Sequence, residues 1–191
     1  MNDTTAGNGK VVVNRTMSLD GFIAGPGDNQ DWLFDFISND TPEQKEAAAA
    51  TGAMLVGRRT VEVGTRREAN QEQGTESRDE GYPFYGPMFV LTHQPPDPPD
   101  PDVTYLTGDI GEAVATALKA AGGKNLQILG ADVAGQCFQR GLVDEILVNV
   151  LPVLLGDGIR FSAPGLSRID LEPVSNTQAG AVTILRFRVR K

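Results

Sequence analysis

Four consecutive residues, Gly57-Arg58-Arg59-Thr60, combine the side chains and the setting that a phosphate group requires. They follow the short apolar stretch 53–56 and begin a segment that predicts a helix, so their backbone N–H groups and the helix dipole would face an anion. The two arginines add bidentate donors, and the threonine hydroxyl can donate a further hydrogen bond. The motif therefore indicates a phosphate site, although an ordinary helix start with solvated arginines can have the same sequence.

Two more predicted strand ends carry residues of a similar kind. Thr92 and His93 stand at the carboxyl end of the apolar segment 87–92, and the small residues Gly130 and Ala131 follow the apolar segment 125–129. In open α/β sheets ligands gather beyond the carboxyl ends of the strands, and small residues let a pyrophosphate approach the backbone. A plain turn and close strand–helix packing are the alternatives. Together the three junctions favour a dinucleotide or another phosphate-bearing ligand across one sheet edge.

Asp20 stands in the segment MSLDG, which ends the first predicted strand at this same edge. A carboxylate there could orient a reactive ring or relay a proton, whereas an Asp-Gly turn is the common structural role of the dipeptide. No complete dinucleotide or P-loop glycine fingerprint occurs. With His93 and Cys137 as the single histidine and the single cysteine, we expect neither a metal site nor a Ser-His-Asp triad.

Alternating elements must position these residues. The pattern predicts strands over 10–17, 53–56, 87–92, 103–106, 125–129 and 143–155, and helices over 28–40, 41–52, from 57 onward, 109–121 and 132–140. Residues 68–81 are expected to form a surface loop and 94–102 an extended proline-rich connection. At the C-terminus, alternation predicts a half-solvated antiparallel strand with Arg186, Arg188 and Arg190 on its polar side.

The order of these elements defines the expected fold class. Strands alternate with helices through residue 155, and β-only sequence follows, which is typical of one α/β domain with a mostly parallel sheet and antiparallel edge strands at the C-terminus. We expect a flexible tail over 1–9 and this single domain over 10–191. A chain of 191 residues is long enough to bury one core without disulfides.

The charge balance limits the partners. Lys and Arg number 17 against 25 Asp and Glu, a net charge of −8, which argues against a general nucleic-acid or anionic-membrane surface. No apolar run approaches the roughly 20 residues of a transmembrane helix, and residues 1–9 lack the apolar core of a signal peptide. Because Cys137 has no partner for an internal disulfide, the expected compartment is the reducing cytoplasm.

Read in order, the junctions resemble the dihydrofolate-reductase-like superfamily. Within it the chain is most similar to the C-terminal reductase domain of the bifunctional riboflavin-biosynthesis deaminase–reductase. The stretches that carry the resemblance are MSLDGFIAG (17–25), DWL (31–33), VGRRT (56–60), FVLTH (89–93), the long segment 128–161 and the arginine-striped final strand. They cover nearly the whole chain past the tail, and the ordered set is specific although no single piece is.

The resemblance implies a three-layer fold with a central mixed sheet, and NADPH as the hydride donor. It assigns the cofactor to three groups of residues: Gly57, Arg58, Arg59 and Thr60 with its phosphates, Thr92 and His93 near the adenosine ribose and its 2′-phosphate, and Gly130, Ala131, Asp132 and Val133 at the pyrophosphate. Ala131 departs from the usual Gly-Gly turn of the family, which adds a methyl group near the pyrophosphate.

The resemblance also implies a substrate end of the site. Asp20 would be the catalytic acidic residue there, and the substrate pocket would involve Phe22, Trp32, Gly156, Asp157 and Gly158. The expected activity is NADPH-dependent reduction of a small heterocyclic or ribosylaminopyrimidine-type molecule, as in the riboflavin pathway. Reduction of another pterin-like or secondary-metabolite heterocycle, and NADPH binding without turnover, are the alternatives. The family further implies a homodimer joined through the C-terminal strands.

Overall fold

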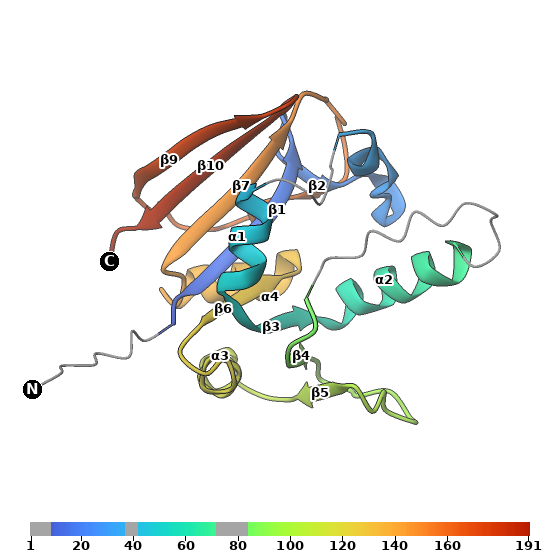
Figure 1. Ribbon diagram of the computed structural model, residues 1–191. Coiled ribbons are helices and arrows are strands. Elements are labelled where there is room, and N and C mark those ends of the chain that lie inside the picture. The colour runs from blue at the N-terminus through green and yellow to red at the C-terminus, as the bar shows by residue number, and fades with distance from the viewer. Residues whose placement is uncertain (1–8, 37–41, 72–83) are drawn as a thin grey trace, which may run out of the picture.

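The computed structural model describes residues 9–36, 42–71 and 84–191, and its centre is an eight-stranded sheet (Figure 1). The strand order is β5-β4-β3-β6-β1-β7-β10-β9. All pairs from β5 to β7 are parallel, and β10 is antiparallel to both β7 and β9. The strands are β1 (Val11–Ser18), β3 (Thr51–Gly57), β4 (Met88–Leu91), β5 (Val103–Leu106), β6 (Asn125–Leu129), β7 (Glu145–Leu151), β9 (Leu171–Ala179) and β10 (Val182–Val189).

Helices cover both faces of this sheet, which confirms the expected three-layer, mixed α/β fold. Helices α1 (Pro42–Ala50) and α2 (Arg58–Gln71) lie on what we call the α1 face, where Ala47 packs on Leu147 and Val61 packs on Val56. Helices α3 (Ile110–Ala120) and α4 (Ala131–Gln139) lie on the opposite α4 face. Two short 3-10 turns, η1 (Pro26–Asp28) and η2 (Asp31–Asp35), follow β2 (Phe22–Ala24), which pairs with β8 (Ile159–Arg160).

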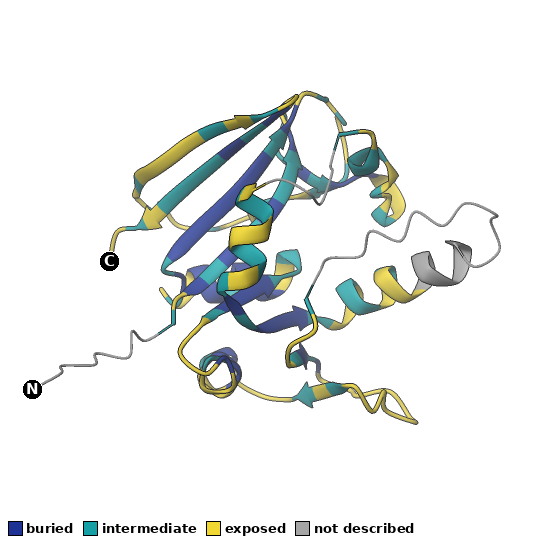
Figure 2. Cartoon of the chain, viewed as in Figure 1, coloured by how far each residue is buried: buried dark blue, intermediate teal, exposed yellow. Residues whose placement is uncertain are grey.

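The main core lies between the α4 face of the sheet and the helices α3 and α4. Val13, Leu55, Leu126 and Ile128 are fully buried there, because central parallel strands are covered on both faces and are therefore rich in apolar residues (Figure 2). Helix α3 contributes the buried side chains of Ile110, Ala113, Val114 and Ala117 to this core. Its N-cap is the Asp109 carboxylate, which accepts a hydrogen bond from the Gly111 N–H at 2.8 Å.

Several element boundaries differ from the sequence prediction. The strand expected over 143–155 ends at Leu151, because Pro152 has no N–H to continue the ladder, and Leu154 is 69% exposed. Helix α2 continues through Gln71, so the loop expected from residue 68 begins later. The segment 28–40 forms the 3-10 turn η2 rather than one helix, and its end at 37–40 lies outside the described residues. Residues 1–8 and 72–81, expected as tail and loop, lie outside them too.

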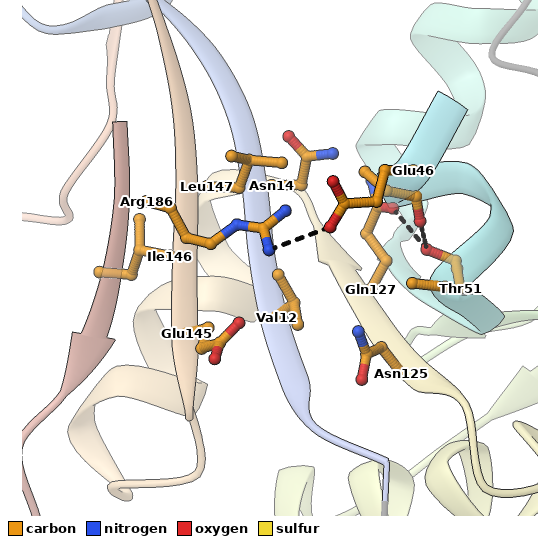
Figure 3. A pocket seen from close by; sticks show the side chains of 12 residues that line it. Val12, Asn14, Glu46, Thr51, Asn125, Gln127, Glu145, Ile146, Leu147 and Arg186 are labelled. Atoms are coloured by element: carbon orange, nitrogen blue, oxygen red, sulfur yellow. Dashed lines mark hydrogen bonds and ion pairs between the residues drawn. The ribbon is translucent and has the colours of Figure 1, made fainter. Parts of the chain in front are cut away.

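The C-terminal strand is antiparallel as expected, and on its polar side Arg188 and Arg190 are exposed whereas Arg186 is covered. Leu185, Phe187 and Val189 pack on the core of the α4 face as expected. On the other side, Arg186 is only 28% exposed, because its guanidinium pairs with Glu46 of α1 at 3.4 Å (Figure 3). Strand β9 forms the outer edge of the sheet and exposes apolar side chains; the homodimer expected at these strands stays a prediction. Among the described residues, no helix is long and apolar enough to cross a bilayer.

Candidate functional site

A cavity of about 560 Å³ opens on the α1 face at the carboxyl ends of the central strands. This volume lies within the usual range of small-molecule and cofactor sites, roughly 300–1,000 Å³. Strands β1, β6 and β7 form its floor, α2 and the β6–α4 turn form one wall, and the segment from β2 to η2 forms the other. The apolar side chains on that second wall include Ile23, Leu33 and Phe34.

Two of the sequence-predicted phosphate junctions meet in the first wall. Gly57 and Thr60 line the cavity beside Gly130, because β3 and β6 are parallel neighbours in which Val56 pairs with Leu129. Gly130 has a φ of 91°, and a Cβ there would lie 2.7 Å from Thr60 Oγ1. Only glycine therefore fits at this position, and we call the close approach of the β6–α4 turn to Gly57 and Thr60, in the wall of the cavity, the cradle.

The remaining residues of the β6–α4 junction also line the cavity. Ala131, Asp132 and Val133 form the first turn of α4, whose N–H groups have no intrahelical acceptor. The Asp132 carboxylate accepts a hydrogen bond from Gln136 Nε2 at 2.9 Å. The turn therefore combines unpaired backbone donors with a helix N-terminus, an arrangement suited to an anionic ligand.

The two arginines after Gly57 lie in different surroundings. Arg59 lines the cavity and forms a two-point ion pair with Asp28 on the opposite wall. Arg58 is not among the lining residues and pairs with Glu62, one turn further along α2, at 3.2 Å. Adjacent helical residues point about 100° apart, so only one of the pair can face the cavity.

The cavity floor is polar, a feature that the sequence analysis missed. Asn14, Thr16, Gln127 and Asn149 lie on the α1 face of β1, β6 and β7, and Asn149 Nδ2 donates to Thr16 Oγ1 at 3.3 Å. The signal was present, since each of these residues interrupts a strand that is otherwise rich in apolar residues. Buried amides of this kind can bind the donors and acceptors of a polar ring.

A second, small cavity continues this floor beneath α1 and shares Asn14 and Gln127 with the large one (Figure 3). Its volume of about 50 Å³ suits only a few water molecules. Thr51 Oγ1 lies 3.3 Å from Gln127 Oε1 and donates to the Ala47 carbonyl at 2.7 Å, which ties the floor to the helix. The large cavity is therefore the one with the dimensions of a ligand site.

A buried arginine on β1, which the sequence analysis also missed, reaches the wall of the large cavity. Arg15 is 7% exposed, and its guanidinium donates to the Gly130 carbonyl. Burial lowers its pKa to about 10, so the group is still charged at neutral pH.

Asp20 does not line the cavity. Its carboxylate accepts hydrogen bonds from Ser18 Oγ at 2.6 Å, from the Gly156 N–H at 2.7 Å and from the Leu155 N–H at 3.1 Å. The Ser18 hydrogen bond is the largest cause that lowers the pKa of Asp20 to about 2, and the two backbone donors add to it. Asp20 thus ties the end of β1 to the turn that begins at Leu155.

The other residues predicted for the substrate end lie behind the apolar wall. Phe22 is buried under the Arg160 guanidinium, which stands 4.6 Å from its ring centre. Trp32, in η2 next to the lining residue Leu33, packs against the apolar cluster that contains Leu147. Gly156, Asp157 and Gly158 do not line the cavity, although Ile159 does. A Cβ on Gly158 would lie 2.0 Å from the Ala24 carbonyl oxygen, so this glycine permits β2 and β8 to pair.

Thr92 and His93 stand at the end of β4, one strand beyond the cavity wall. Thr92 is buried and its hydroxyl hydrogen-bonds with the backbone of Gln94, while His93 is exposed; neither lines the cavity. Their place beside β3 puts them on the same sheet edge as Gly57. Among the described residues, no group of three or more His, Cys, Asp and Glu side chains is arranged to hold a metal ion.

The fold and this cavity define an α/β domain with a small-molecule site at the carboxyl ends of its central strands, and comparison with known proteins identifies its family. The profile of the RibD C-terminal domain matches residues 9–185. The chain therefore belongs to the RibD C-terminal domain family, which confirms the resemblance found in the sequence. An uncharacterized protein of Bacillus subtilis strain 168, YwjB, is 26% identical over 152 residues, 78% of this chain and 80% of that protein.

Solved structures have the same fold. A Shewanella sp. PV-4 protein provisionally assigned to riboflavin biosynthesis superposes with a TM-score of 0.78 at 22% identity, over 95% of this chain and 99% of the other. The dihydrofolate reductase of Enterococcus faecalis, solved in complex with NADP(H) and RAB-propyl, has a TM-score of 0.64 at 16% identity, over 97% and 99% of the two chains. The chain is thus a RibD-like member of the dihydrofolate-reductase fold.

Proposed function

We propose that this protein is an NADPH-dependent reductase of a small heterocyclic molecule of the ribosylaminopyrimidine type. The observation that carries the proposal is the junction of Gly57, Thr60 and Gly130 in the wall of a ligand-sized cavity with a polar floor. Family membership and the NADP(H) bound by the Enterococcus dihydrofolate reductase support the choice of cofactor. The riboflavin-pathway assignment of the Shewanella protein supports the choice of substrate class.

The residues present fit this cofactor. Gly130 lines the cavity without a side chain, and its close approach to Thr60 brings the threonine and the backbone of the turn together in one wall, where both can contact a diphosphate. The first turn of α4 offers unpaired N–H donors, and Arg59 adds a guanidinium on the same side of the cavity. Arg58, Thr92 and His93 lie further out along the same edge, where we propose that they contact the adenosine end.

NADPH, when bound, supplies a hydride to an electrophilic carbon of the substrate. We assign recognition of the polar heterocycle to the amide side chains of Asn14, Gln127 and Asn149 on the floor. The apolar wall of Ile23, Leu33 and Phe34 would exclude bulk water and hold the ring in place.

We propose a positioning role for Asp20 in place of a direct proton transfer. A carboxyl group with a pKa of about 2 stays ionised at neutral pH and has no proton to give. Its hydrogen bonds to Leu155 and Gly156 hold the turn that leads to Ile159 on the cavity wall. The proton that accompanies reduction would then come from water that enters with the substrate.

The test combines binding and turnover. Calorimetric titration should give tight binding of NADPH and weaker binding of NADH, and a ribosylaminopyrimidine should cause loss of NADPH absorbance. Millimolar binding with no preference between the two cofactors would overturn the assignment. Tight NADPH binding without oxidation by any of a panel of pyrimidine and pterin substrates would instead identify a binding protein that lacks turnover.

A further inference from the structure

A charged side chain is buried in β1 where the strand pattern calls for an apolar one. Arg15 follows Val11 and Val13 on the α4 face and pairs in register with the core residue Val148. It is only 7% exposed, and its Nε has no hydrogen-bond partner among the described residues. Burying an unpaired charge is costly, so a residue of this kind needs a compensating group.

No carboxylate compensates this charge within the part of the chain that the structure describes. The titratable group in electrostatic contact with Arg15 is Cys137, and burial raises the pKa of that thiol to about 12, so it is neutral at physiological pH. The other guanidiniums beside the site differ in this respect, since Arg59 is paired with Asp28 and Arg58 with Glu62. Of the two described arginines that line the cavity, Arg15 is the one without a described carboxylate partner.

The guanidinium is held directly behind the cradle for the diphosphate. It donates to the Gly130 carbonyl, which also accepts the Ala134 N–H at 3.1 Å in the first turn of α4. This contact fixes the turn in which Gly130 has its positive φ, and it places the positive charge at the cavity wall beside the free N–H groups of α4. In a low-dielectric setting, such a charge acts strongly on an anion bound at the turn.

We propose that Arg15 supplies the counter-charge for the diphosphate group of the dinucleotide at the Gly130 turn. The proposal rests on the proposed function and adds a residue that determines cofactor affinity. Arg15 lies on the other side of the Gly130 turn from the bound diphosphate. It explains why a charge is kept in an otherwise apolar layer: the bound anion, rather than a carboxylate of the chain, compensates it. Arg15 is thus a positioning residue for the cofactor, acting through the Gly130 turn.

The test measures cofactor affinity and the stability of the ligand-free protein in the same variants. Arg15→Met removes the charge and keeps the volume, Arg15→Gln keeps a donor for the Gly130 carbonyl without the charge, and Arg15→Lys keeps the charge. Arg168→Met, at an exposed arginine paired with Asp170, is the control for net charge. Each is titrated calorimetrically with NADPH and, separately, with inorganic pyrophosphate, and its melting temperature is recorded without ligand.

We expect Arg15→Met and Arg15→Gln to weaken NADPH and pyrophosphate binding by about 10- to 100-fold, while Arg15→Lys stays within about 5-fold of the parent. Arg15→Met should melt at or above the parent temperature, because an uncompensated buried charge is replaced by an apolar group. A merely structural arginine would lower the melting temperature in all three variants. If Arg15→Met does not fold, the Arg15→Gln and Arg15→Lys pair still separates charge from hydrogen bonding.

The outcomes separate the two proposals. Unchanged affinity in Arg15→Gln and Arg15→Met, with tight NADPH binding by the parent, overturns the role of Arg15 and leaves the reductase assignment standing. Binding of pyrophosphate but not of NADPH by the parent, lost on removal of the charge, supports Arg15 and overturns the cofactor assignment. A parent protein that binds neither ligand overturns both.

Discussion

Asp28 pairs with the guanidinium of Arg59 in the lining of the cavity, with Arg59 Nε 3.0 Å from Oδ2 and Nη2 2.9 Å from Oδ1. The two residues come from opposite walls, η1 and the start of α2. Asp28 is also the one described residue other than glycine with a positive φ, 65°. The Asp28 carboxylate therefore competes for the Arg59 guanidinium with the phosphate that the proposed function places there.

Removal of this carboxylate should strengthen cofactor binding. Asp28→Asn frees Arg59 and suits the left-handed backbone, in which asparagine is tolerated. We expect NADPH to bind about 3-fold more tightly in calorimetry, the scale of a single exposed ion pair. Asp31→Asn, in the same loop but away from Arg59, is the matched control and should change nothing. Weaker binding in Asp28→Asn would mean that the ion pair builds the site instead of competing for it.

Substitution of Arg58 and of Arg59, both in α2, should change the affinities for NADPH and NADH in different ways. Arg59→Ala should weaken NADPH and NADH alike, by about 10-fold, because Arg59 faces the part of the cavity where the phosphates common to both would bind. Arg58→Ala should weaken NADPH more than NADH, since Arg58 lies outside the cavity on the proposed adenosine side. Titration of both cofactors against both variants gives the comparison. An equal loss of the two cofactors in Arg58→Ala would exclude Arg58 from reading the 2′-phosphate.

Gly130→Ala should destabilise the fold and close the cradle. The new Cβ would meet Thr60 Oγ1 at 2.7 Å, and alanine is strained at a φ of 91°. We expect a loss of about 2–3 kcal/mol in the free energy of unfolding, measured by denaturant titration. Gly141→Ala is the control, because Gly141 also has a positive φ, 64°, but open space around it. A cost in Gly130→Ala no larger than in the control would show that the Thr60 contact is not tight.

Stability at acid pH should report the hydrogen bonds of Asp20. Because its folded pKa is lowered to about 2, the ionised carboxylate stabilises the protein above its ordinary pKa of 3.8, and this contribution is lost as the pH falls from about 4 to 2. The difference in melting temperature between the parent and Asp20→Asn should be constant from pH 5 to 7 and shrink below about pH 4.

Ser18→Ala provides the internal check for that experiment. It removes the largest cause of the lowered pKa, so the folded pKa should move toward 3.8, and the loss of stability between about pH 4 and 2 should be smaller than in the parent and end at a higher pH. A difference between parent and Asp20→Asn that grows as the pH falls would contradict the assignment.

Local patterns were sufficient to predict most of the elements. Each strand–glycine–helix junction depends on residues close in sequence. These are an apolar, β-branched run for the strand, a glycine for the turn, and an N-cap residue such as Asp109 for the helix. Boundaries were less predictable where backbone hydrogen bonds come from a distance. The strand expected up to residue 155 ends at Leu151, and the N–H groups of Leu155 and Gly156 donate to Asp20, which lies more than 130 residues earlier.

The sequence by itself determined the α/β class, the family and the junctions at Gly57 and Gly130, because these follow from near-neighbour backbone preferences and a long ordered set of motifs. Only the tertiary structure decided that β3 lies beside β6, so that the two junctions share one wall. It also decided that Arg59 meets Asp28, that Asp20 binds the turn at Gly156 instead of lining the cavity, and that Arg15 is buried with no carboxylate partner among the described residues. Charges find their partners through long-range packing, which no local pattern specifies.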